Sequence, residues 1–260
     1  MKHLPPLAMF AAPTVPQALK QGINAHAATH LQVDIAPYPN MGKGDLIELF
    51  WNNCFAASKR VGAADIGQPS SLRVPESFVQ NGAARIHYRV MQVGRGPARS
   101  LITRVQVKTA CPGGQPSVLC GEENQSLAPV GLPETIRRHG VNPSQIRRGV
   151  PLIIEPYLNM ATGDAITLRW GDARLDLPPI QAHEVGRPVH VWVPSALILD
   201  AGDDARQEVT YCVIDRVGNN SRWAPPRTVS IGQAQAQAHG PAGHPSVYQP
   251  RRPGSPCEPG

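Results

Sequence analysis

The chain has 260 residues, which is enough for two domains, and it carries a formal net charge of +6. Aromatic residues make up only 5%, whereas 28 prolines and 24 glycines suit short strands joined by many turns. The basic residues are scattered, without a basic helix or an aromatic and basic run, which disfavours a nucleic-acid partner, and no apolar run approaches the length of a membrane-spanning helix.

The chain begins with a short apolar run that is interrupted by Pro5 and Pro6 and followed by Pro13. It is shorter than the apolar region of a secretory signal peptide. We therefore expect a flexible leader over residues 1–12 and no conventional signal peptide. Residues 13–30 are a lead-in to the first domain, with a single helical turn predicted to end at Gly22.

One stretch occurs twice. Residues 35–51 and 154–170 are identical at ten of seventeen positions, all at an offset of 119 residues. Both copies contain Pro-Tyr-x-Asn-Met-x-x-Gly-Asp, followed by Ile-x-Leu-x-Trp at alternating positions. Shared apolar residues at period two indicate a strand that is buried on one face, and the Asn, Gly and Asp residues before it are typical of a turn. The similarity extends over a whole domain, which predicts two copies of one architecture.

The first domain is predicted over residues 13–110, and a linker rich in Pro, Gly, Ser and Cys over 111–129. Strands are expected in the first domain at 31–36, 45–51, 71–74, 84–93 and 101–108. The second domain is predicted over 130–232. It begins with a short helix over Pro133–Gly140, and its strands are expected at 151–155, 164–170, 174–177, 188–193, 207–215 and 226–231.

Residues 233–260 contain few large apolar side chains, so we expect a disordered C-terminal tail. Its Tyr248, Arg251 and Arg252 could dock on a partner, although a solvated tail is the favoured interpretation.

Short strands with turn signals every eight to twelve residues predict antiparallel β-sandwiches. Residues 209–221 sharpen this prediction, because their Tyr-x-Val-x-Asp-x-x-Gly-Asn-x-Ser pattern resembles the penultimate strand and hairpin of bacterial immunoglobulin-like and fibronectin-like modules. The resemblance implies a tyrosine-corner role for Tyr211 and a hairpin turn at Gly218 and Asn219. The first copy keeps Tyr88 but reads Gly-Arg-Gly-Pro at 94–97 in place of the hairpin.

The whole repeated unit resembles the tandem immunoglobulin-like repeats of large bacterial surface and adhesin-like proteins. The resemblance implies an all-β fold of two tandem immunoglobulin-like antiparallel sandwiches that act in adhesion, protein binding or spacing, without catalysis. A carbohydrate-binding or targeting module of a secreted or toxin-delivery system is the alternative. The surface or a signal-independent secretion route is favoured as the location, and the sequence leaves the cytoplasm open.

The sequence contains no signature of a hydrolase, nucleotide-binding or metalloprotease site, so we expect no enzyme activity, no cofactor and no catalytic residue. His183, Glu184 and His190 form the nearest cluster of metal-ligating types, and residues 200–204 form an acidic loop. Neither set is repeated in the first copy, so we favour surface residues and a solvated turn over metal sites.

The tryptophans separate into two groups. Trp51 and Trp170 are duplicated with the apolar strand positions, so we expect them in the core, whereas Trp192 and Trp223 occur only in the second copy and are candidate ligand contacts. Arg222, beside Trp223, is included with them. The partner is an unknown protein or glycan.

Five cysteines occur, and no pair is repeated between the copies. Cys111 and Cys120 flank a short loop, and the sequence does not decide between a disulfide there and two reduced thiols.

Overall fold

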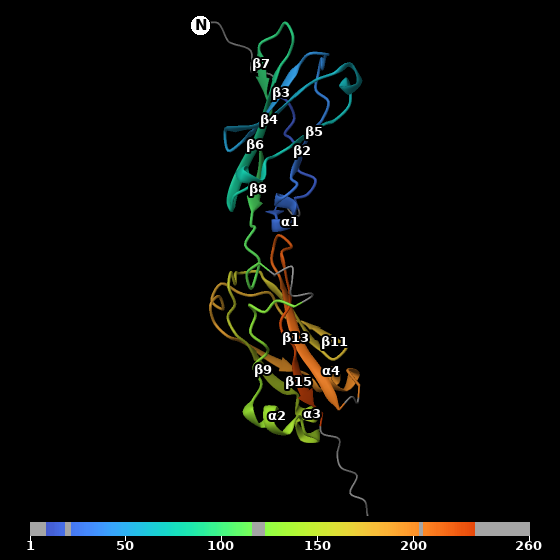
Figure 1. Cartoon of the computed structure of the whole chain (residues 1–260), viewed down its shortest axis with the longest axis vertical. Coiled ribbons are helices and arrows are strands. Elements are labelled where there is room, and N and C mark those ends of the chain that lie inside the picture. The colour runs from blue at the N-terminus through green and yellow to red at the C-terminus, as the bar shows by residue number, and fades with distance from the viewer. Residues whose placement is uncertain (1–8, 19–21, 116–122, 203–204, 232–260) are drawn as a thin grey trace, which may run out of the picture.

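A computed structural model describes residues 9–18, 22–115, 123–202 and 205–231. The two predicted domains lie end to end and give an elongated molecule (Figure 1). Most of the leader and the C-terminal tail, including Tyr248, Arg251 and Arg252, lie outside the described residues. No helix in the described part of the chain is both long enough and apolar enough to cross a membrane.

The first domain is a sandwich of two sheets. Strands β2 (Gln32–Ile35) and β5 (Ser70–Arg73) pair antiparallel in the smaller sheet. The larger sheet has the order β4-β3-β6-β8-β1, and β7 pairs with β6 beside β8. The strands of the larger sheet are β1 (Gly22–Ile23), β3 (Leu46–Trp51), β4 (Cys54–Arg60), β6 (Gly82–Met91), β7 (Pro97–Arg99) and β8 (Thr103–Val107).

The second domain repeats this topology for every strand except β1. Strands β9 (Val150–Ile154) and β12 (Val189–Val193) form the smaller sheet. The larger sheet consists of β11 (Ala173–Asp176), β10 (Ala165–Trp170), β13 (Arg206–Ile214) and β14 (Asn220–Trp223), with β15 (Arg227–Ser230) also paired to β13. The all-β sandwich predicted from the sequence is therefore confirmed.

The lead-in segments add a parallel pairing at the last strand of each domain. Strand β1 pairs parallel with β8, and Val141 forms the equivalent parallel bridge with Ile231. Both are followed by an Asn that caps a helix: Asn24 caps α1 (Ala25–Ala28) and Asn142 caps α3 (Pro143–Arg148). The helix predicted before Gly140 is α2 (Glu134–His139), and a further helix, α4 (Ser195–Asp200), follows β12.

The repeated apolar positions form the two cores. Trp51 is 2% exposed and Trp170 is 0% exposed, as expected for duplicated aromatic residues on a buried strand face. Tyr38 and Tyr157 are also buried, and in each domain the tyrosine hydroxyl donates to the aspartate that ends the motif. The polar part of the motif is therefore a surface loop that its buried tyrosine and aspartate attach to the core.

The lead-in begins earlier in each domain than the sequence analysis placed it. Phe10, assigned there to the leader, is buried, stacks on Tyr88 and bridges Ser100. Leu127, assigned to the linker, is buried in the second core. In both domains the lead-in contacts the larger sheet first and then the smaller one, through Thr14 or Gly131. Because the lead-in passes from one sheet to the other, it packs against the sandwich although it is rich in proline and has no strand pattern.

The tyrosine-corner prediction for Tyr211 is wrong. Its hydroxyl donates to the carbonyl oxygen of Ala128 at 3.0 Å, 83 residues upstream, and not to the backbone just before its own strand. Because Ala128 lies in the lead-in, Tyr211 attaches this segment to the larger sheet. The predicted hairpin turn is present, and Gly218 adopts a φ of 85° in it.

The buried tyrosines predict a loss of stability at alkaline pH. Burial raises the pKa of Tyr88 and of Tyr211 to about 12, whereas a tyrosine in the unfolded chain titrates near ~10. Between these values the unfolded chain loses protons that the folded chain keeps, so the free energy of unfolding should fall as the pH rises from about 10 to about 12. Urea unfolding between pH 8 and 11.5 checks this. The Tyr88→Phe variant should show a weaker pH dependence, and an unchanged profile would contradict the assignment.

Candidate functional site

The junction between the domains is built around the hairpin that joins β13 to β14. Asp215 holds the hairpin tip, because its Oδ1 accepts the backbone N–H groups of Val217 at 3.0 Å and Asn219 at 2.9 Å. Its Oδ2 accepts the side-chain amide of Asn219 at 2.9 Å. Asp215 and Asn219 are both buried. The hairpin therefore presents one fixed amide toward the first domain, and Figure 1 shows it reaching α1.

Asn219 joins the two ends of the first domain to the second. Its Oδ1 accepts the backbone N–H of Ala25, the first residue of α1, at 2.8 Å. Its Nδ2 donates to the carbonyl oxygen of Lys108, directly after β8, at 2.7 Å. One side chain thus fixes both the lead-in and the exit of the first domain.

Lys108 adds an ionic contact across the same junction. Its Nζ lies 2.9 Å from Asp215 Oδ2 and 3.8 Å from Asp164 Oδ1. The lysine side chain is 25% exposed, whereas the two carboxylate side chains are 1% and 0% exposed. A buried carboxylate pair would repel without a cation between its members, so Lys108 supplies the charge that this junction requires.

The two carboxyl groups respond differently to this environment. Burial acts to raise the pKa of Asp215, but hydrogen bonds from Asn219 and Lys108 outweigh it and lower the pKa. Burial dominates at Asp164 and raises its pKa, against contacts from Ala161, Lys108 and Tyr157. Asp164 Oδ1 has no hydrogen-bond partner in the described residues and faces Lys108 at the longer distance.

The chain after Lys108 also packs on the second domain. Asn159 of the repeated motif donates to the carbonyl oxygen of Cys111 at 2.9 Å, and the N–H of Gly113 donates to Leu158 at 2.7 Å. Cys111 is buried as a thiol, and burial raises its pKa. Cys120, its candidate partner in the sequence, lies outside the described residues.

The same motif has a different role in the first domain. Asp45 is equivalent to Asp164 and also accepts a tyrosine hydroxyl and a backbone N–H of its own loop. Its second oxygen, however, accepts the N–H of Val93 at 3.0 Å, within its own domain. The loop of Asp45 is therefore closed by its own domain, whereas the loop of Asp164 depends on Lys108 of the neighbouring domain.

The three ligand-binding candidates predicted from the sequence lie at two separate places in the structure. Trp192 lies on β12 of the smaller sheet and is 58% exposed. Its Nε1 donates to the carbonyl oxygen of Arg148 at 3.1 Å, so the indole lies along the surface. It lines an apolar groove of about 450 Å³, together with Leu132, Pro133, Pro151, His190 and other residues of the lead-in, β9 and β12.

Trp223 and Arg222 lie at the end of β14, on the larger sheet. They line a separate pocket of about 560 Å³. The guanidinium carbons of Arg169 and Arg174 lie 5.0 Å and 6.0 Å from the Trp223 ring centroid. Trp223 is therefore covered by two arginines, whereas Trp192 presents an open ring to solvent.

Within the described residues, no group of three or more His, Cys, Asp or Glu side chains could hold a metal ion. Asp203 and Asp204 of the acidic loop lie outside that part of the chain. The junction also contains a cleft of about 810 Å³ that both domains line, with Arg104, Gln106 and Arg216 among its polar residues. Its one carboxylate, Asp215, is already bound to Lys108.

The sequence matches no protein-family model and no curated protein. The fold is similar to the fibronectin(III)-like modules of Clostridium thermocellum CbhA, at 12% identity and a TM-score of 0.42 over 89% of this chain and 99% of that one. A structure from a 1.5-MDa bacterial ice-binding adhesin is 15% identical, at a TM-score of 0.37, over 86% of this chain and 65% of that one.

A bacterial immunoglobulin-like domain of the M. primoryensis ice-binding adhesin is 18% identical, at a TM-score of 0.28, and covers 39% of this chain. These structures are of the module types that the repeat resembles in sequence. The present chain spans less than two thirds of the first adhesin structure. At these TM-scores the likeness says nothing of activity or partner, and the sandwich fold rests on the strand order of the chain itself.

Proposed function

We propose that the chain is a non-enzymatic spacer and binding module, in which two immunoglobulin-like sandwiches are held end to end by a stiff junction. The observation that carries this proposal is the set of contacts from Lys108 and Asn219 across the domain boundary. A flexible linker would leave the two domains independent, whereas these part-buried hydrogen bonds and an ion pair to a buried carboxylate fix one arrangement. Adhesion and protein binding are the functions that such a spacer serves.

The junction is also specific to its place in the chain. Asp215 and Asn219 belong to the hairpin of the second domain, and the first domain has Gln92 and the 94–97 turn at the matching positions. The two copies therefore differ at the hairpin that contacts the preceding domain, although they share the core motif. This difference allows the second domain to bind the C-terminal end of the first, and not the reverse.

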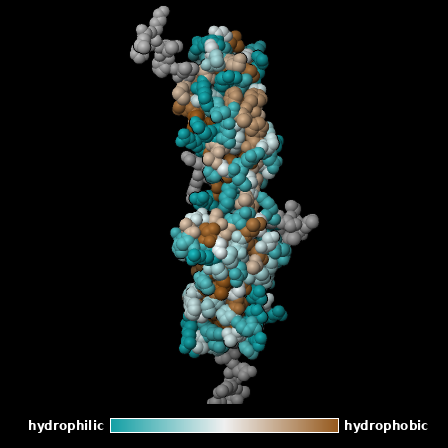
Figure 2. All heavy atoms as spheres, turned by 90° about the vertical axis from the view of Figure 1, so that its left-hand side faces the viewer, coloured by the Kyte–Doolittle hydropathy of each residue, from teal (hydrophilic) through white to brown (hydrophobic). Residues whose placement is uncertain are grey.

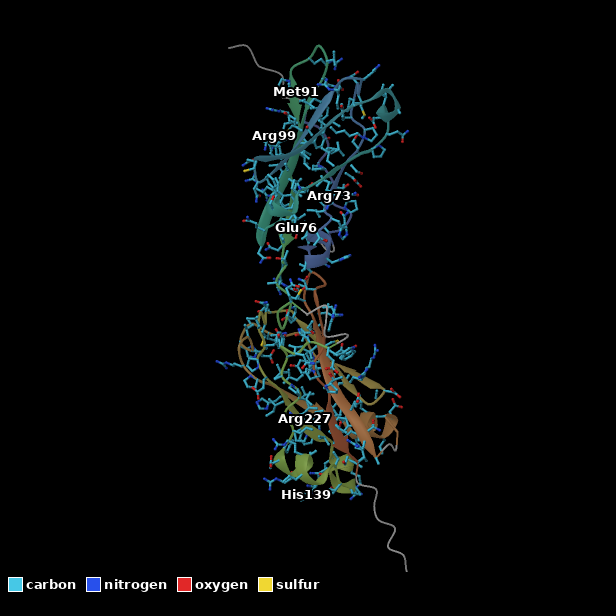
Figure 3. All side chains as sticks on the ribbon, viewed as in Figure 1. Arg73, Glu76, Met91, Arg99, His139 and Arg227 are labelled. Atoms are coloured by element: carbon cyan, nitrogen blue, oxygen red, sulfur yellow. The ribbon has the colours of Figure 1, made fainter. Side chains whose placement is uncertain are left out.

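Distances between spin labels in solution test the stiffness. Labels at Glu76→Cys and His139→Cys report across the junction from exposed positions in the two domains (Figure 3). The background carries Cys54→Ser, Cys120→Ser and Cys257→Ser, so that the added cysteines react. Pulsed electron paramagnetic resonance should then give one narrow distance distribution. A broad distribution would refute the stiff-junction proposal.

A second function, carbohydrate binding, is favoured by the exposed indole of Trp192. Aromatic rings on concave apolar surfaces are typical of ligand sites, and the groove beside Trp192 is lined mainly by apolar side chains. Because Trp192 is largely solvent-exposed, Trp192→Ala should change the melting temperature little.

If the groove binds sugars, a glycan array should identify a ligand for the unaltered chain. Calorimetry with that glycan should then show an affinity at least tenfold lower for Trp192→Ala. Trp223→Ala removes an indole of the same size from the other sheet and serves as the matched control. Equal losses in both variants, or no glycan binding by the unaltered chain, would refute this second function.

A further inference from the structure

Arginine and aromatic side chains that are far apart in the sequence lie together on the outer face of the larger sheet in the first domain. Outward side chains of neighbouring strands form three rows. Arg85 of β6 lies opposite Arg104 of β8 in the first row. His87 of β6 lies opposite Phe50 of β3, which in turn lies opposite Phe55 of β4, in the second row.

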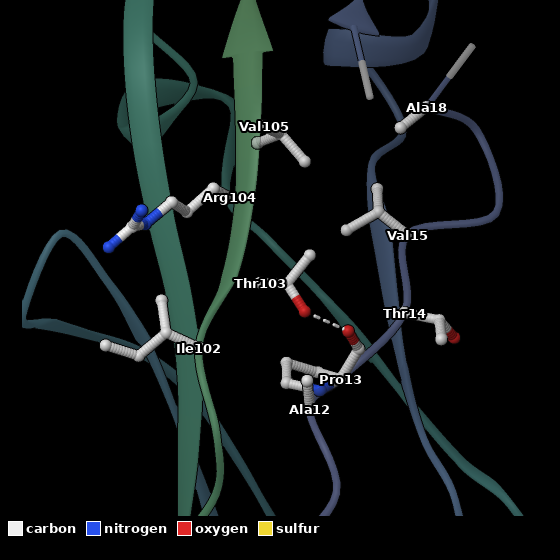
Figure 4. Close-up of a pocket in the computed structure, with 9 residues that line it drawn as sticks. All are labelled: Ala12, Pro13, Thr14, Val15, Ala18, Ile102, Thr103, Arg104 and Val105. Carbon is white, nitrogen blue, oxygen red and sulfur yellow. Dashed lines mark hydrogen bonds between the residues drawn. The ribbon is translucent and has the colours of Figure 1, made fainter. Parts of the chain in front are cut away.

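In the third row, Arg89 of β6 lies between Arg99 of β7 and Glu48 of β3. Two arginine rows therefore flank an aromatic row, and we call these residues the arginine face. Four residues along β6 separate its outer rows, or about 13 Å at the rise of a β-strand. Figure 4 shows Arg104 turned away from the lead-in and across β6, and Figure 3 places Arg99 on the opposite side of the domain from Arg73.

The charges of this face are not balanced within the protein. Like charges directly opposite each other in a sheet are destabilising, and this face has two such pairs, Arg85 with Arg104 and Arg89 with Arg99. Glu48 binds Arg89, with an oxygen to nitrogen distance of 2.6 Å. In the described part of the chain, Arg85, Arg99 and Arg104 have no ion-pair partner. Stability alone does not account for this arrangement.

The rings of the aromatic row pack against one another, and Arg89 lies over one of them. The His87 ring stacks on Phe50 at 5.0 Å with an interplanar angle of 4°, and the Arg89 guanidinium carbon lies 5.5 Å from the Phe50 centroid. His87 is only 6% exposed, and its Nδ1 has no partner in the described residues. Burial lowers the pKa of His87, and the charges of Arg99, Arg85 and Arg89 lower it further. Burial and the neighbouring charges therefore favour the neutral form of His87 between the arginines.

The second domain shows that this face is not a requirement of the fold. At the positions of Arg85 and Arg104 it has Glu208 and Thr228, which also lie opposite each other. At the position of His87 it has Thr210. The second domain does contain one opposed arginine pair, Arg169 with Arg174, but Arg169 also lies 3.8 Å from Glu208. The same sheet can thus be built with a glutamate and a threonine at the places of Arg85 and Arg104.

We propose that the arginine face binds a linear acidic polysaccharide, one that carries carboxylate or sulfate groups along the chain. Planar guanidinium groups match both anions in two-point contacts, and the two arginine rows suit charges that repeat along an extended polymer. Figure 2 shows that hydrophilic residues cover much of the upper half of the molecule on the side that it displays. Because the arginine face extends over neighbouring strands of one sheet and reaches the junction cleft at Arg104, a long flexible ligand can lie across it. This inference is independent of the stiff junction and of the Trp192 groove.

A polysaccharide fits better than a single-stranded nucleic acid. Sequence-tolerant binding of single strands relies on aromatic ring faces that are free to stack on bases. Here His87 covers Phe50 with parallel rings, and Phe55 meets Phe50 edge to face, with an interplanar angle of 80°. Phe55, at 53% exposure, is the ring of this row with the most open surface. Guanidinium groups rather than stacking platforms therefore dominate the face.

Binding to heparin, polygalacturonate and a thirty-residue oligothymidylate tests the proposal with the full chain. Heparin or polygalacturonate should bind, and the affinity should fall steeply with salt. The double variant Arg85→Gln/Arg104→Gln should lose at least tenfold in affinity, because it removes two guanidinium groups that can form charge-assisted hydrogen bonds with the ligand. Its unfolding stability should stay equal or rise, because the variant removes a like-charge pair.

The double variant Arg147→Gln/Arg187→Gln removes the same charge from exposed positions of the second domain and should keep its affinity within about twofold. If both double variants lost the same affinity, the effect would come from net charge alone, and the arginine face would not be the binding site. Binding of oligothymidylate at least as tight as that of both polysaccharides would assign the face to nucleic acid instead. Absence of binding to all three probes would also overturn it.

Discussion

Lys108→Met is expected to uncouple the two domains. The substitution keeps most of the apolar side chain but leaves Asp215, and Asp164 beside it, without a cation at a buried site. Removing one partner of a fully buried ion pair costs about 3–5 kcal/mol, and because Lys108 is partly exposed we expect a loss of about 2 kcal/mol from the second domain. The spin-label distance distribution across the junction should broaden, and the second domain should melt below the first.

Two further variants separate the missing charge from a general loss of packing. Lys108→Met combined with Asp215→Asn replaces the uncompensated carboxylate by a neutral amide, and it should recover part of the lost stability. Lys43→Met changes an exposed lysine of the first domain and should leave both readouts unchanged. If Lys108→Met kept a narrow distance distribution and the original melting temperature, Lys108 would not be what holds the junction.

The predicted strands were most accurate where the period-two pattern was repeated. Strands β3 and β10 lie within one residue of their predicted bounds, because Ile, Leu and Trp at alternating positions require one buried face. Strand β4 was missed, since an edge strand that is mostly exposed has no such alternation. The capping box from Asn142 to Gln145 was a readable signal for α3.

The junction could not be derived from one copy of the motif. Its four polar residues, Lys108, Asp164, Asp215 and Asn219, are spread over more than one hundred positions, and each alone is typical of a turn or a surface. The available signal was a difference between the copies, since the second has Gly-Asn at 218–219 where the first has another turn. That difference was interpreted as loop chemistry, whereas the structure shows that it connects the domains.

The arginine face was hidden for a related reason. Its residues come from five strands, and only the strand register places them together. The alternation Arg85-x-His87-x-Arg89 was visible in the sequence and indicates one face of one strand. The opposing arginines of β7 and β8 could be assigned only once the pairing was known. The Trp192 candidate, in contrast, followed directly from its absence in the first copy.

Substitution of the repeated aspartate should distinguish its two roles. Asp45 is 2% exposed and accepts hydrogen bonds from Tyr38, Gly42 and Val93. Asp45→Ala leaves these donors without a partner, and each buried unsatisfied donor costs about 1–3 kcal/mol before water enters and relaxes the loop. We expect the first domain to lose about 3 kcal/mol in urea unfolding, with faster hydrogen exchange in its motif loop and an unchanged distance across the junction.

Asp164→Ala should lower the stability of its own domain and also loosen the junction between the domains. It removes the same tyrosine and backbone contacts, so the second domain should lose a similar free energy of unfolding. It also removes one of the two carboxylates that face Lys108, so the interdomain distance distribution should broaden where Asp45→Ala leaves it narrow. The matched pair Tyr38→Phe and Tyr157→Phe deletes one hydroxyl from each motif and should lower stability without moving the domains. If Asp45→Ala and Asp164→Ala gave the same distance distribution, the aspartate would have one role in both copies, and the junction would depend on Lys108, Asp215 and Asn219 without Asp164.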